Sequence, residues 1–374
     1  MAISKRICRH LRLAAFTLAV VLAVLVVTSV NSFLPRNDNI VERSSSSSLL
    51  AGAAGRKSLY IRAKEPDPSS ESPTESSAGD VKSFRASDPT LLIKREFEAG
   101  NEPKRMIFIG DIHGCVDQFN SLLDELKFQQ GEDQIVLVGD LVAKGPESLA
   151  VIQKASSIGA WCVRGNHDDR VIRWREFLDG PGKGMSKDEL SQLEDSGGLP
   201  YDDFKVSKEH YDIAGQLTAE ELEFLQSFSV IMAPPPPYTE WIVVHGGLEA
   251  QKPVLNQTAD TCMTIRNVAA TGPISTHDQG VAWFDIWAAK MQILEGLPPN
   301  PLATPSDSTE EDYNNINFNK IIYGHDAGRG LQIHDYTKGL DSRCVYGGNL
   351  TAFILPGEQL VSVPCVNYDD KAPD

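Results

Sequence analysis

The stretch "IVLVGDLVAKGPES" (135–148) joins a run of β-branched apolar residues to a Gly-Asp pair, a lysine and a Gly-Pro turn. The apolar run predicts a buried strand that ends just before Asp140. Because open α/β sheets place their ligands at the carboxyl ends of strands, Asp140 lies where a functional site is expected. Taken alone, Asp140 is better explained as a cap of the helix expected to begin near Pro146.

Four further stretches repeat this pattern: "RMIFIGDIHGC" (105–115), "WCVRGNHDDR" (161–170), "EWIVVHGGL" (240–248) and "NKIIYGHDAGRG" (319–330). Each ends an apolar strand on Asp, His or Asn beside a glycine. Such a pattern counts as a motif when every copy has the same structural context, as these five do. The predicted metal ligands at these strand ends are Asp111, His113, Asp140, Asn166, His245 and His325.

Carboxylate, imidazole and amide ligands together suit divalent Zn, Mn, Fe, Co or Mg. Two such ions, about 3.5–4 Å apart and sharing one carboxylate, clamp an in-line displacement at phosphorus, with a metal-held hydroxide as nucleophile. Asp140 is central in chain order and is the expected bridge. His167 directly follows the ligand Asn166, so its side chain is expected to point elsewhere and to protonate the leaving oxygen.

The first half of the body alternates strands and helices, which predicts a β-α-β-α-β unit with parallel strands and right-handed crossovers. Polar, glycine-rich residues 179–216 predict an insertion over the site, and Thr218 with Glu221 forms a capping box. The C-terminal third predicts short strands. We therefore expect an α/β (α+β) fold of two mixed sheets flanked by helices. The expected strands are 105–110, 135–139 and 160–164, separated by helices at 119–128 and 146–159.

The N-terminal region differs from this body. Basic residues among 1–12 precede an uncharged apolar run at 13–30, which predicts a cytosolic tail and a transmembrane signal anchor, with a cleaved signal peptide as the alternative. Residues 31–102 are rich in Ser, Pro and Glu and predict a disordered stalk. The catalytic domain is expected at 103–368, on the lumenal or external side.

A formal charge of −16 argues against nucleic acid as a main ligand. Six cysteines without CxxC spacing form neither a disulfide framework nor a zinc knuckle, and one or two unassigned disulfides stay open. The sequon at Asn256 lies in a polar loop and could be glycosylated. The sequon at Asn349 lies in an expected core strand and should be inaccessible.

The series G-D-x-H-G, G-D-x-V-x-K-G, G-N-H-D, V-H-G-G, Y-G-H over about residues 105–350 resembles the calcineurin-like metallophosphoesterases of the phosphoprotein-phosphatase type. This resemblance implies a four-layer β-sandwich. It also implies that Asp111 and His113 hold one metal with Asp140. The second metal would take Asp140 together with Asn166, His245 and His325.

The chain departs from the serine/threonine phosphatases of that superfamily at Ala143-Lys144, where they carry Asp-Arg. Ala143 removes the carboxylate that orients the catalytic histidine, so His167 needs another partner, for which Asp168 is the candidate. Lys144 keeps the charge without the bidentate fork of arginine. The stretches "GHDAGRGLQ" and "GLDSRCVYGGNLTAF" are similar to the diadenosine-tetraphosphatase-like branch, in which glycine is usual at the position of Arg343.

That branch includes a membrane-anchored endopolyphosphatase of the fungal vacuole, and the anchor, stalk and motifs here are similar to it. The resemblance implies endo-cleavage of inorganic polyphosphate at a vacuole membrane, with dinucleoside polyphosphates as the alternative substrate. A Ser/Thr protein phosphatase is a weaker alternative, because the Asp-Arg pair is missing, and a metal-free binding module is more distant. A polyanion on an acidic protein needs cations near the metals. The candidates are Lys144, Arg164, Arg170 and Arg343, with Arg173 and Arg329.

Overall fold

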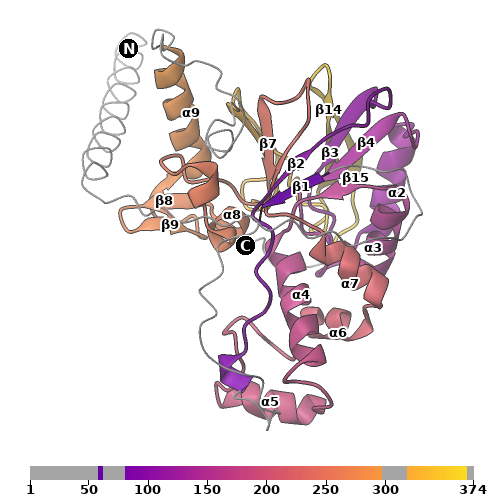
Figure 1. Ribbon diagram of the computed structural model, residues 1–374, viewed down its shortest axis with the longest axis vertical. Coiled ribbons are helices and arrows are strands. Elements are labelled where there is room, and N and C mark those ends of the chain that lie inside the picture. The colour runs from indigo at the N-terminus through magenta and orange to yellow at the C-terminus, as the bar shows by residue number, and fades with distance from the viewer. Residues whose placement is uncertain (1–57, 62–80, 297–317, 369–374) are drawn as a thin grey trace, which may run out of the picture.

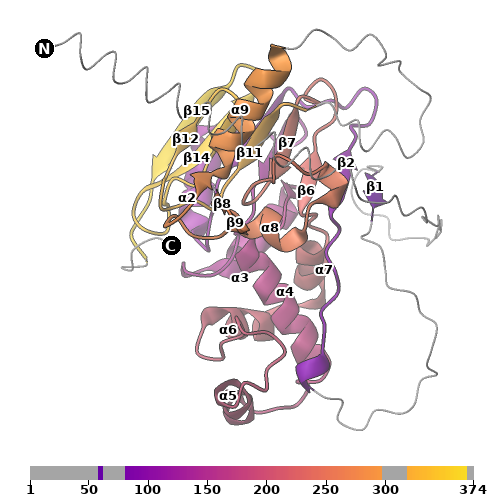
Figure 2. The ribbon, with the colours of Figure 1, turned by 90° about the vertical axis from the view of Figure 1, so that its left-hand side faces the viewer.

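The computed structural model describes residues 58–61, 81–296 and 318–368. A five-stranded and a seven-stranded sheet pack face to face, and helices cover both outer faces (Figures 1 and 2). Three apolar clusters separate the four layers. One lies between the sheets, one lies under α2 and α3, and one lies under α8 and α9. The expected fold of two mixed sheets with helices outside is confirmed.

The five-stranded sheet contains the predicted β-α-β-α-β unit. Strand β3 pairs in parallel with β4, and β4 pairs in parallel with β5. The β14–β15 hairpin extends this sheet antiparallel to β3. In spatial order its strands are β15 (Gln359–Pro364), β14 (Asn349–Leu355), β3 (Arg105–Ile109), β4 (Asp133–Leu137) and β5 (Trp161–Cys162).

The seven-stranded sheet supplies the remaining ligands. Strand β11 lies between β7 and β13 and pairs in parallel with both. The spatial order is β1 (Ser58–Ile61), β2 (Leu92–Arg95), β6 (Ile231–Ala233), β7 (Trp241–Val244), β11 (Lys320–Tyr323), β13 (Thr337–Gly339) and β12 (Gln332–Ile333). A small antiparallel sheet, which the sequence did not predict, consists of β10 (Val281–Ala282), β8 (Asn267–Ala269) and β9 (Gly272–Ile274).

The helices of the first half follow the predicted periodicity. Phe119 and Leu122 of α2 are fully buried on one face, as their spacing requires. The capping box of Thr218 and Glu221 begins α7 as predicted. The described helices are α2 (Val116–Glu125), α3 (Ser148–Ser157), α4 (Asn166–Asp179), α5 (Lys187–Asp195), α6 (Glu209–Gln216), α7 (Ala219–Gln226), α8 (Ala259–Thr264) and α9 (Trp283–Glu295).

Helix α4 continues away from the sheets toward α5 and α6, which form the predicted insertion (Figures 1 and 2). Helix α6 packs along α4. The aromatic rings of Trp174 on α4 and Phe204 in the insertion stack at a centroid distance of 4.0 Å. The buried side chains of the insertion belong to the same apolar cluster as those under α2 and α3, so the insertion is packed on the body.

The expected domain boundary at 103 is wrong. Strand β2 (Leu92–Arg95) pairs in parallel with β6, and Leu92 and Ile93 are buried. The Ser- and Pro-rich composition upstream hid this short apolar run. The folded body therefore includes residues that were assigned to the stalk.

Two other expectations concern the chain ends and the sequons. The predicted anchor at 13–30 lies outside the described residues, and no helix within them is long and apolar enough to span a bilayer. Asn256 is exposed, as expected. The expectation for Asn349 is wrong, because Asn349 is the first residue of β14 and is exposed, while the buried part of the strand begins at Leu350.

Candidate active site

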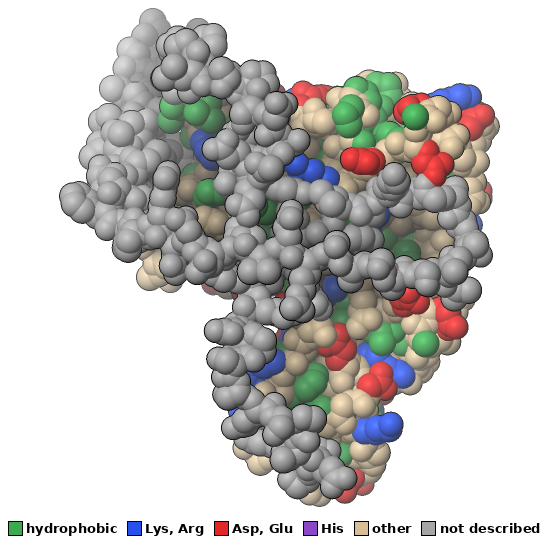
Figure 3. All heavy atoms as spheres, viewed as in Figure 1, with side chains coloured by type: hydrophobic (Ala, Val, Ile, Leu, Met, Phe, Trp, Pro, Cys, Tyr) green, Lys and Arg blue, Asp and Glu red, His purple; other side chains and the backbone are tan. Residues whose placement is uncertain are grey.

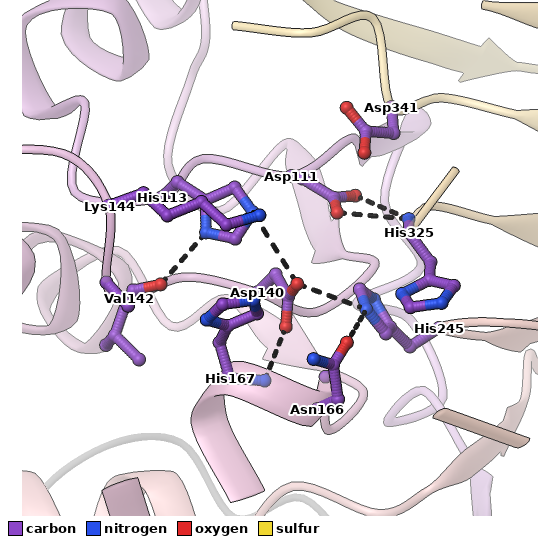
Figure 4. A network of polar contacts seen from close by, with 12 residues as sticks. Asp111, His113, Asp140, Val142, Lys144, Asn166, His167, His245, His325 and Asp341 are labelled. Atoms are coloured by element: carbon purple, nitrogen blue, oxygen red, sulfur yellow. Dashed lines mark hydrogen bonds and ion pairs between the residues drawn. The ribbon is translucent and has the colours of Figure 1, made fainter. Parts of the chain in front are cut away.

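All six predicted ligands meet in one cluster, where the strands of the two sheets end (Figure 4). Asp111 and His113 follow β3, Asp140 follows β4, and Asn166 opens α4 after β5. His245 and His325 come from the other sheet, where they follow β7 and β11. The parallel pairing of β3 with β4 and of β7 with β11 aligns the carboxyl ends of these strands.

Asp140 is the shared member of two ligand groups, which are His113 with Asp140 and His167, and Asp140 with His245 and His325. The ligand atoms within each group lie within 4.8 Å of one another. Oδ2 of Asp140 lies 3.6 Å from Nε2 of His113 and 3.3 Å from Nε2 of His245. This position between the groups is the one expected for a bridging carboxylate.

Three of the histidines each contact a backbone carbonyl through one ring nitrogen. His113 Nδ1 lies 3.0 Å from the oxygen of Val142, and His245 Nδ1 lies 2.9 Å from that of Val138. His325 Nε2 lies 3.1 Å from the carbonyl oxygen of Thr264. Since a carbonyl can only accept, it keeps the ring proton on that nitrogen and leaves the other nitrogen free to bind a metal.

The backbone at the site is strained or closely packed. His113, Asp140 and His325 have φ values of 46°, 52° and 69°, which non-glycine residues rarely adopt. A Cβ added to Gly165 would collide with the Asp140 carboxylate, and one added to Gly324 would collide with Asp111. Glycine accompanies the ligands because the ligand side chains occupy the space that a methyl group would need.

The electrostatics of the site fit a pair of cations. Burial, together with the nearby Asp341 carboxylate, raises the pKa of Asp111. Burial alone would lower the pKa of His245, but Asp140 raises it to about 9, so a proton supplies positive charge beside the carboxylate. Divalent ions would supply that charge at the same ligands, and carboxylate, imidazole and amide are the donors they use. When bound, such a pair provides an activated water and polarises a phosphoryl group.

His167 faces the ligands, but its orienting partner differs from the one predicted. Its Nδ1 lies 2.8 Å from Nε2 of His210, on α6. The Asp168 carboxylate instead accepts hydrogen bonds from the backbone N–H groups of Asp140, Leu141 and Gly165. Asp168 therefore shapes the loop that carries Asp140 and does not orient His167, because the N3 position of α4 turns it toward the helix start. The role of His167 toward the leaving oxygen stays a prediction.

The sequence alone did not identify His210. Its ring is buried, and burial together with the charge of Arg170 lowers its pKa to about 4. The preceding residue, Glu209, accepts a hydrogen bond from the backbone N–H of Lys144. The start of α6 thus contacts both the loop after β4 and the start of α4. The sequence "EHYD" (209–212) contains no glycine, which was the signal that identified the other site segments.

Lys144 lies inside the site. Its Nζ is 3.4 Å from Nε2 of His113 and 5.4 Å from the ring centre of Tyr346. Burial opposes its charge, but Tyr346 and Asp140 raise the pKa of Lys144 above its usual value. Tyr346 and Asp341 both come from the loop after β13, so this loop forms part of the site. From this loop the sequence analysis had named Arg343 alone.

Most of the other predicted substrate cations are engaged with protein groups. Arg164 is buried against Asp169, and Arg170 pairs with Asp203 at 2.9 Å. Arg173 pairs with Asp169 and Asp203, and Arg329 pairs with Asp326 at 2.6 Å. Carboxylates from the insertion and from α4 therefore engage Arg164 and Arg170 in this structure, and their expected role toward the substrate stays a prediction.

Arg266 is a further cation that the sequence analysis missed. It is buried, and its Nη2 donates to the carbonyl oxygen of His325 at 3.3 Å. Its Nε makes no hydrogen bond with the described residues and lies 4.0 Å from Oδ1 of Asp326. It lies at the end of the short α8, in a segment without a glycine signature. Its position places a permanent positive charge beside the second ligand group.

Comparisons with known proteins agree with this geometry. Residues 104–329 match the family described as calcineurin-like phosphoesterase. A symmetrical bis(5'-nucleosyl)-tetraphosphatase of Erwinia tasmaniensis is 29% identical over 296 residues, which cover 68% of this chain and 96% of that protein. A zinc-dependent endopolyphosphatase of Saccharomyces cerevisiae is 25% identical over 303 residues, with coverage of 74% and 86%.

A crystal structure of a protein assigned as a diadenosine tetraphosphatase superposes with a TM-score of 0.52 and 30% sequence identity. The match covers 71% of this chain and 97% of that one. The family match spans more than half of the chain and includes all six ligands and His167. The chain therefore belongs to the calcineurin-like phosphoesterase family and is a metal-dependent phosphoesterase that uses two divalent ions.

Proposed function

We propose that the enzyme cleaves phosphoanhydride bonds inside chains of inorganic polyphosphate. The observation that carries this proposal is Arg343, an exposed cation in the loop that supplies Asp341 and Tyr346 to the metal site. Its side chain is exposed and forms no ion pair with any described residue. Its backbone N–H donates to Asp341, whose carboxylate lies near Asp111 and Lys144.

The backbone of Arg343 supports a functional role for its side chain. Its φ is 69°, in the left-handed region that glycine adopts without cost. A side chain there costs on the order of 1 kcal/mol. Arg343 has this conformational cost and no ion pair within the described protein to offset it, which is best explained by binding to a ligand. An exposed guanidinium favours an anionic ligand, and a polyanion fits this requirement.

Lys144 supplies the second cation. It lies deeper, beside His113, and pairs with no carboxylate of the described residues within 4.0 Å. On the face drawn in Figure 3, acidic and basic side chains of the described residues are interspersed. In this proposal the attraction for a polyanion comes from cations at the site, with Lys144 next to the reacting phosphate and Arg343 for a neighbouring phosphate.

The test is Arg343→Gly assayed on two substrates. We expect kcat/KM for long-chain polyphosphate to fall about fivefold to tenfold, with a weaker salt dependence, because one screened surface charge is lost. The same variant should hydrolyse 4-nitrophenyl phosphate within about twofold of the wild type, since that substrate has no second phosphate. Its melting temperature should not fall, because glycine relieves the left-handed backbone.

Lys127→Gly is the matched control. Lys127 is also exposed and has a φ of 50°, but it lies just after the far end of α2. Its replacement removes one positive charge and relieves the same kind of backbone conformation away from the metals. Equal losses for Arg343→Gly and Lys127→Gly on polyphosphate would count against this role of Arg343 and leave only a general effect of charge.

Dinucleoside polyphosphates are the second candidate, favoured by the similarity to the Erwinia tetraphosphatase. Both substrates contain phosphoanhydride bonds, so the two ligand groups fit either. A direct comparison of kcat/KM on polyphosphate and on diadenosine tetraphosphate separates them. Gel analysis of early products tests the position of cleavage. A ladder of shortened chains supports endo-cleavage, whereas monophosphate beside full-length chains contradicts it.

We further propose that the catalytic domain faces the lumen, anchored by residues 13–30, in a vacuole-type compartment. The disulfide between Cys344 and Cys365 supports an oxidising environment, in which such bonds persist. The exposed sequon at Asn256 supports the same placement. Protease protection of the domain in sealed membranes, together with a glycosidase-sensitive shift in mass, tests this proposal.

A further inference from the structure

We propose that His210 is a positioning residue that holds His167 as a neutral hydrogen-bond donor, and that this donor favours phosphoanhydrides over phosphate esters of alcohols. The inference deepens the proposed function and rests on it only in taking a phosphoanhydride as the substrate. It starts from the pairing of two buried imidazoles, 43 positions apart in the chain, at 2.8 Å.

His167 differs from the three metal-ligand histidines in the nature of its partner. Those three contact backbone carbonyls, which can only accept, so the other ring nitrogen of each is the one that can offer a lone pair to a metal. The partner of His167 is an imidazole, which can donate. If His210 donates from Nε2 to Nδ1 of His167, the proton of His167 lies on Nε2, the nitrogen left for the site.

The environment of His210 selects this direction. Nδ1 of His210 is buried and has no hydrogen-bond partner among the described residues. In the proposed arrangement this nitrogen is a bare acceptor. In the reverse arrangement it would be a buried N–H without an acceptor, and orphaned buried N–H groups are rarer in proteins than unsatisfied acceptors. The ring centroids of His167 and His210 also lie 4.9 Å apart, with 27° between the ring planes, so contact between the rings helps to fix how each one is oriented.

A neutral donor suits one class of leaving group. When an anhydride is cleaved, water adds to phosphorus and gives up a proton to the solvent, and the bridging oxygen departs with the electron pair of the P–O bond, as part of a phosphate anion. Phosphate is a weak base, so a hydrogen bond from His167 stabilises that oxygen and the proton can stay on the ring. An alkoxide or phenoxide is a strong base and needs a full proton. An imidazolium supplies that proton, and a carboxylate partner would stabilise the imidazolium.

Three substitutions of His210 test this inference. His210→Gln keeps a side-chain N–H donor and should leave kcat for tripolyphosphate within about threefold of the wild type. His210→Glu places an acceptor there, which moves the ring proton of His167 to Nδ1 and adds a negative charge that favours the imidazolium over the neutral ring. The ratio of kcat/KM for phenyl phosphate to that for 4-nitrophenyl phosphate should then rise about tenfold. His210→Phe keeps the stacked ring without the hydrogen bond and should lower kcat for tripolyphosphate about 10- to 100-fold.

Two measurements separate positioning from loss of structure. Metal content should stay at two ions in all three variants, because His210 contacts none of the six ligands. Nitrogen NMR of ¹⁵N-histidine in the zinc-loaded enzyme should show the Nε2–H form of His167 in the wild type and in His210→Gln. In His210→Glu the Nδ1 should be protonated. Gln216→Ala, on the exposed end of α6, serves as the control for disturbance of the helix.

The inference is wrong if His210→Phe keeps wild-type turnover of tripolyphosphate, or if Gln and Glu at position 210 give the same ratio of phenyl to nitrophenyl hydrolysis. Loss of metal from His210→Phe would also contradict it, because His167 would then act as a ligand. These results differ from failure of the proposed function, which would appear as negligible wild-type activity on every polyphosphate while the aryl phosphates are still cleaved.

Discussion

Asp140 contacts three histidines at once. One carboxylate oxygen lies near His113 and His245, and the other accepts the backbone N–H of His167 at 2.9 Å. Removal of one charge from this position therefore affects both ligand groups. We expect Asp140→Asn to abolish turnover and to lose most of the bound metal, because an amide cannot supply charge to two cations.

The measurement for Asp140→Asn combines elemental analysis with thermal unfolding in a zinc titration. Zinc should raise the melting temperature of the wild type through binding to the native state, and should have a much smaller effect on the variant. Asp124→Asn, an exposed carboxylate on α2 without a described ion pair, should behave as the wild type. Two bound metals and normal turnover in Asp140→Asn would remove the bridging assignment.

At the scale of elements, Asp203 joins the insertion to α4. Burial alone would raise its pKa, but the hydrogen bonds and charges of Arg173 and Arg170 lower the pKa to about 2. A lowered pKa in the folded state means that the stabilisation is present above the unfolded value, about 3.9, and is lost as pH falls toward 2. The pair therefore persists at mildly acidic pH.

We expect Asp203→Asn to lower the free energy of unfolding by about 1 kcal/mol at pH 7, a value reduced for solvent screening because the carboxylate is 36% exposed. The deficit should shrink when urea unfolding is repeated near pH 3. Asp124→Asn serves again as the exposed control. A deficit that stays constant from pH 7 to pH 3 would show that packing, and not the ion pairs, explains the loss.

At the scale of the whole molecule, residues 81–95 connect the insertion to the seven-stranded sheet. Phe84 contacts the ring of Phe177 on α4, the backbone N–H of Ala86 donates to the hydroxyl of Tyr201, and Ile93 of β2 is fully buried between the sheets. We expect a chain beginning at residue 81 to be folded and active, because it loses only the edge strand β1 of the described elements.

A chain beginning at residue 104 lacks β2 and exposes the buried edge of β6. We expect it to aggregate or to melt at least 10 °C lower, since it loses two fully buried aliphatic side chains, roughly 2–5 kcal/mol each. Size-exclusion chromatography and thermal unfolding of the two truncated chains, with metal content as the common control, make the comparison. Equal stability of the two chains would show that the folded domain begins near residue 103 and does not need β2.

The metal site is the part of the molecule that local sequence determines most completely. Each ligand follows an apolar strand and stands beside a glycine, and both features are short-range. The parallel unit through β3, β4 and β5 could be predicted for the same reason, since its periodicity lies within each segment. The cluster of six ligands can therefore be predicted from two local features, the end of an apolar strand and an adjacent glycine.

The remaining features depend on segments that meet only after folding. His210 reaches His167 from 43 positions away, Asp203 neutralises Arg170 across 33, and Cys344 bonds to Cys365 across 21. Strand β2 enters the sheet beside β6, more than a hundred residues later. No local pattern marks such partners, because their free energy comes from burial and complementary charge at contacts that exist only in the packed molecule. The ligands of this phosphoesterase are therefore visible in its sequence, whereas the groups that orient His167 and neutralise its arginines are set by how the insertion packs on α4.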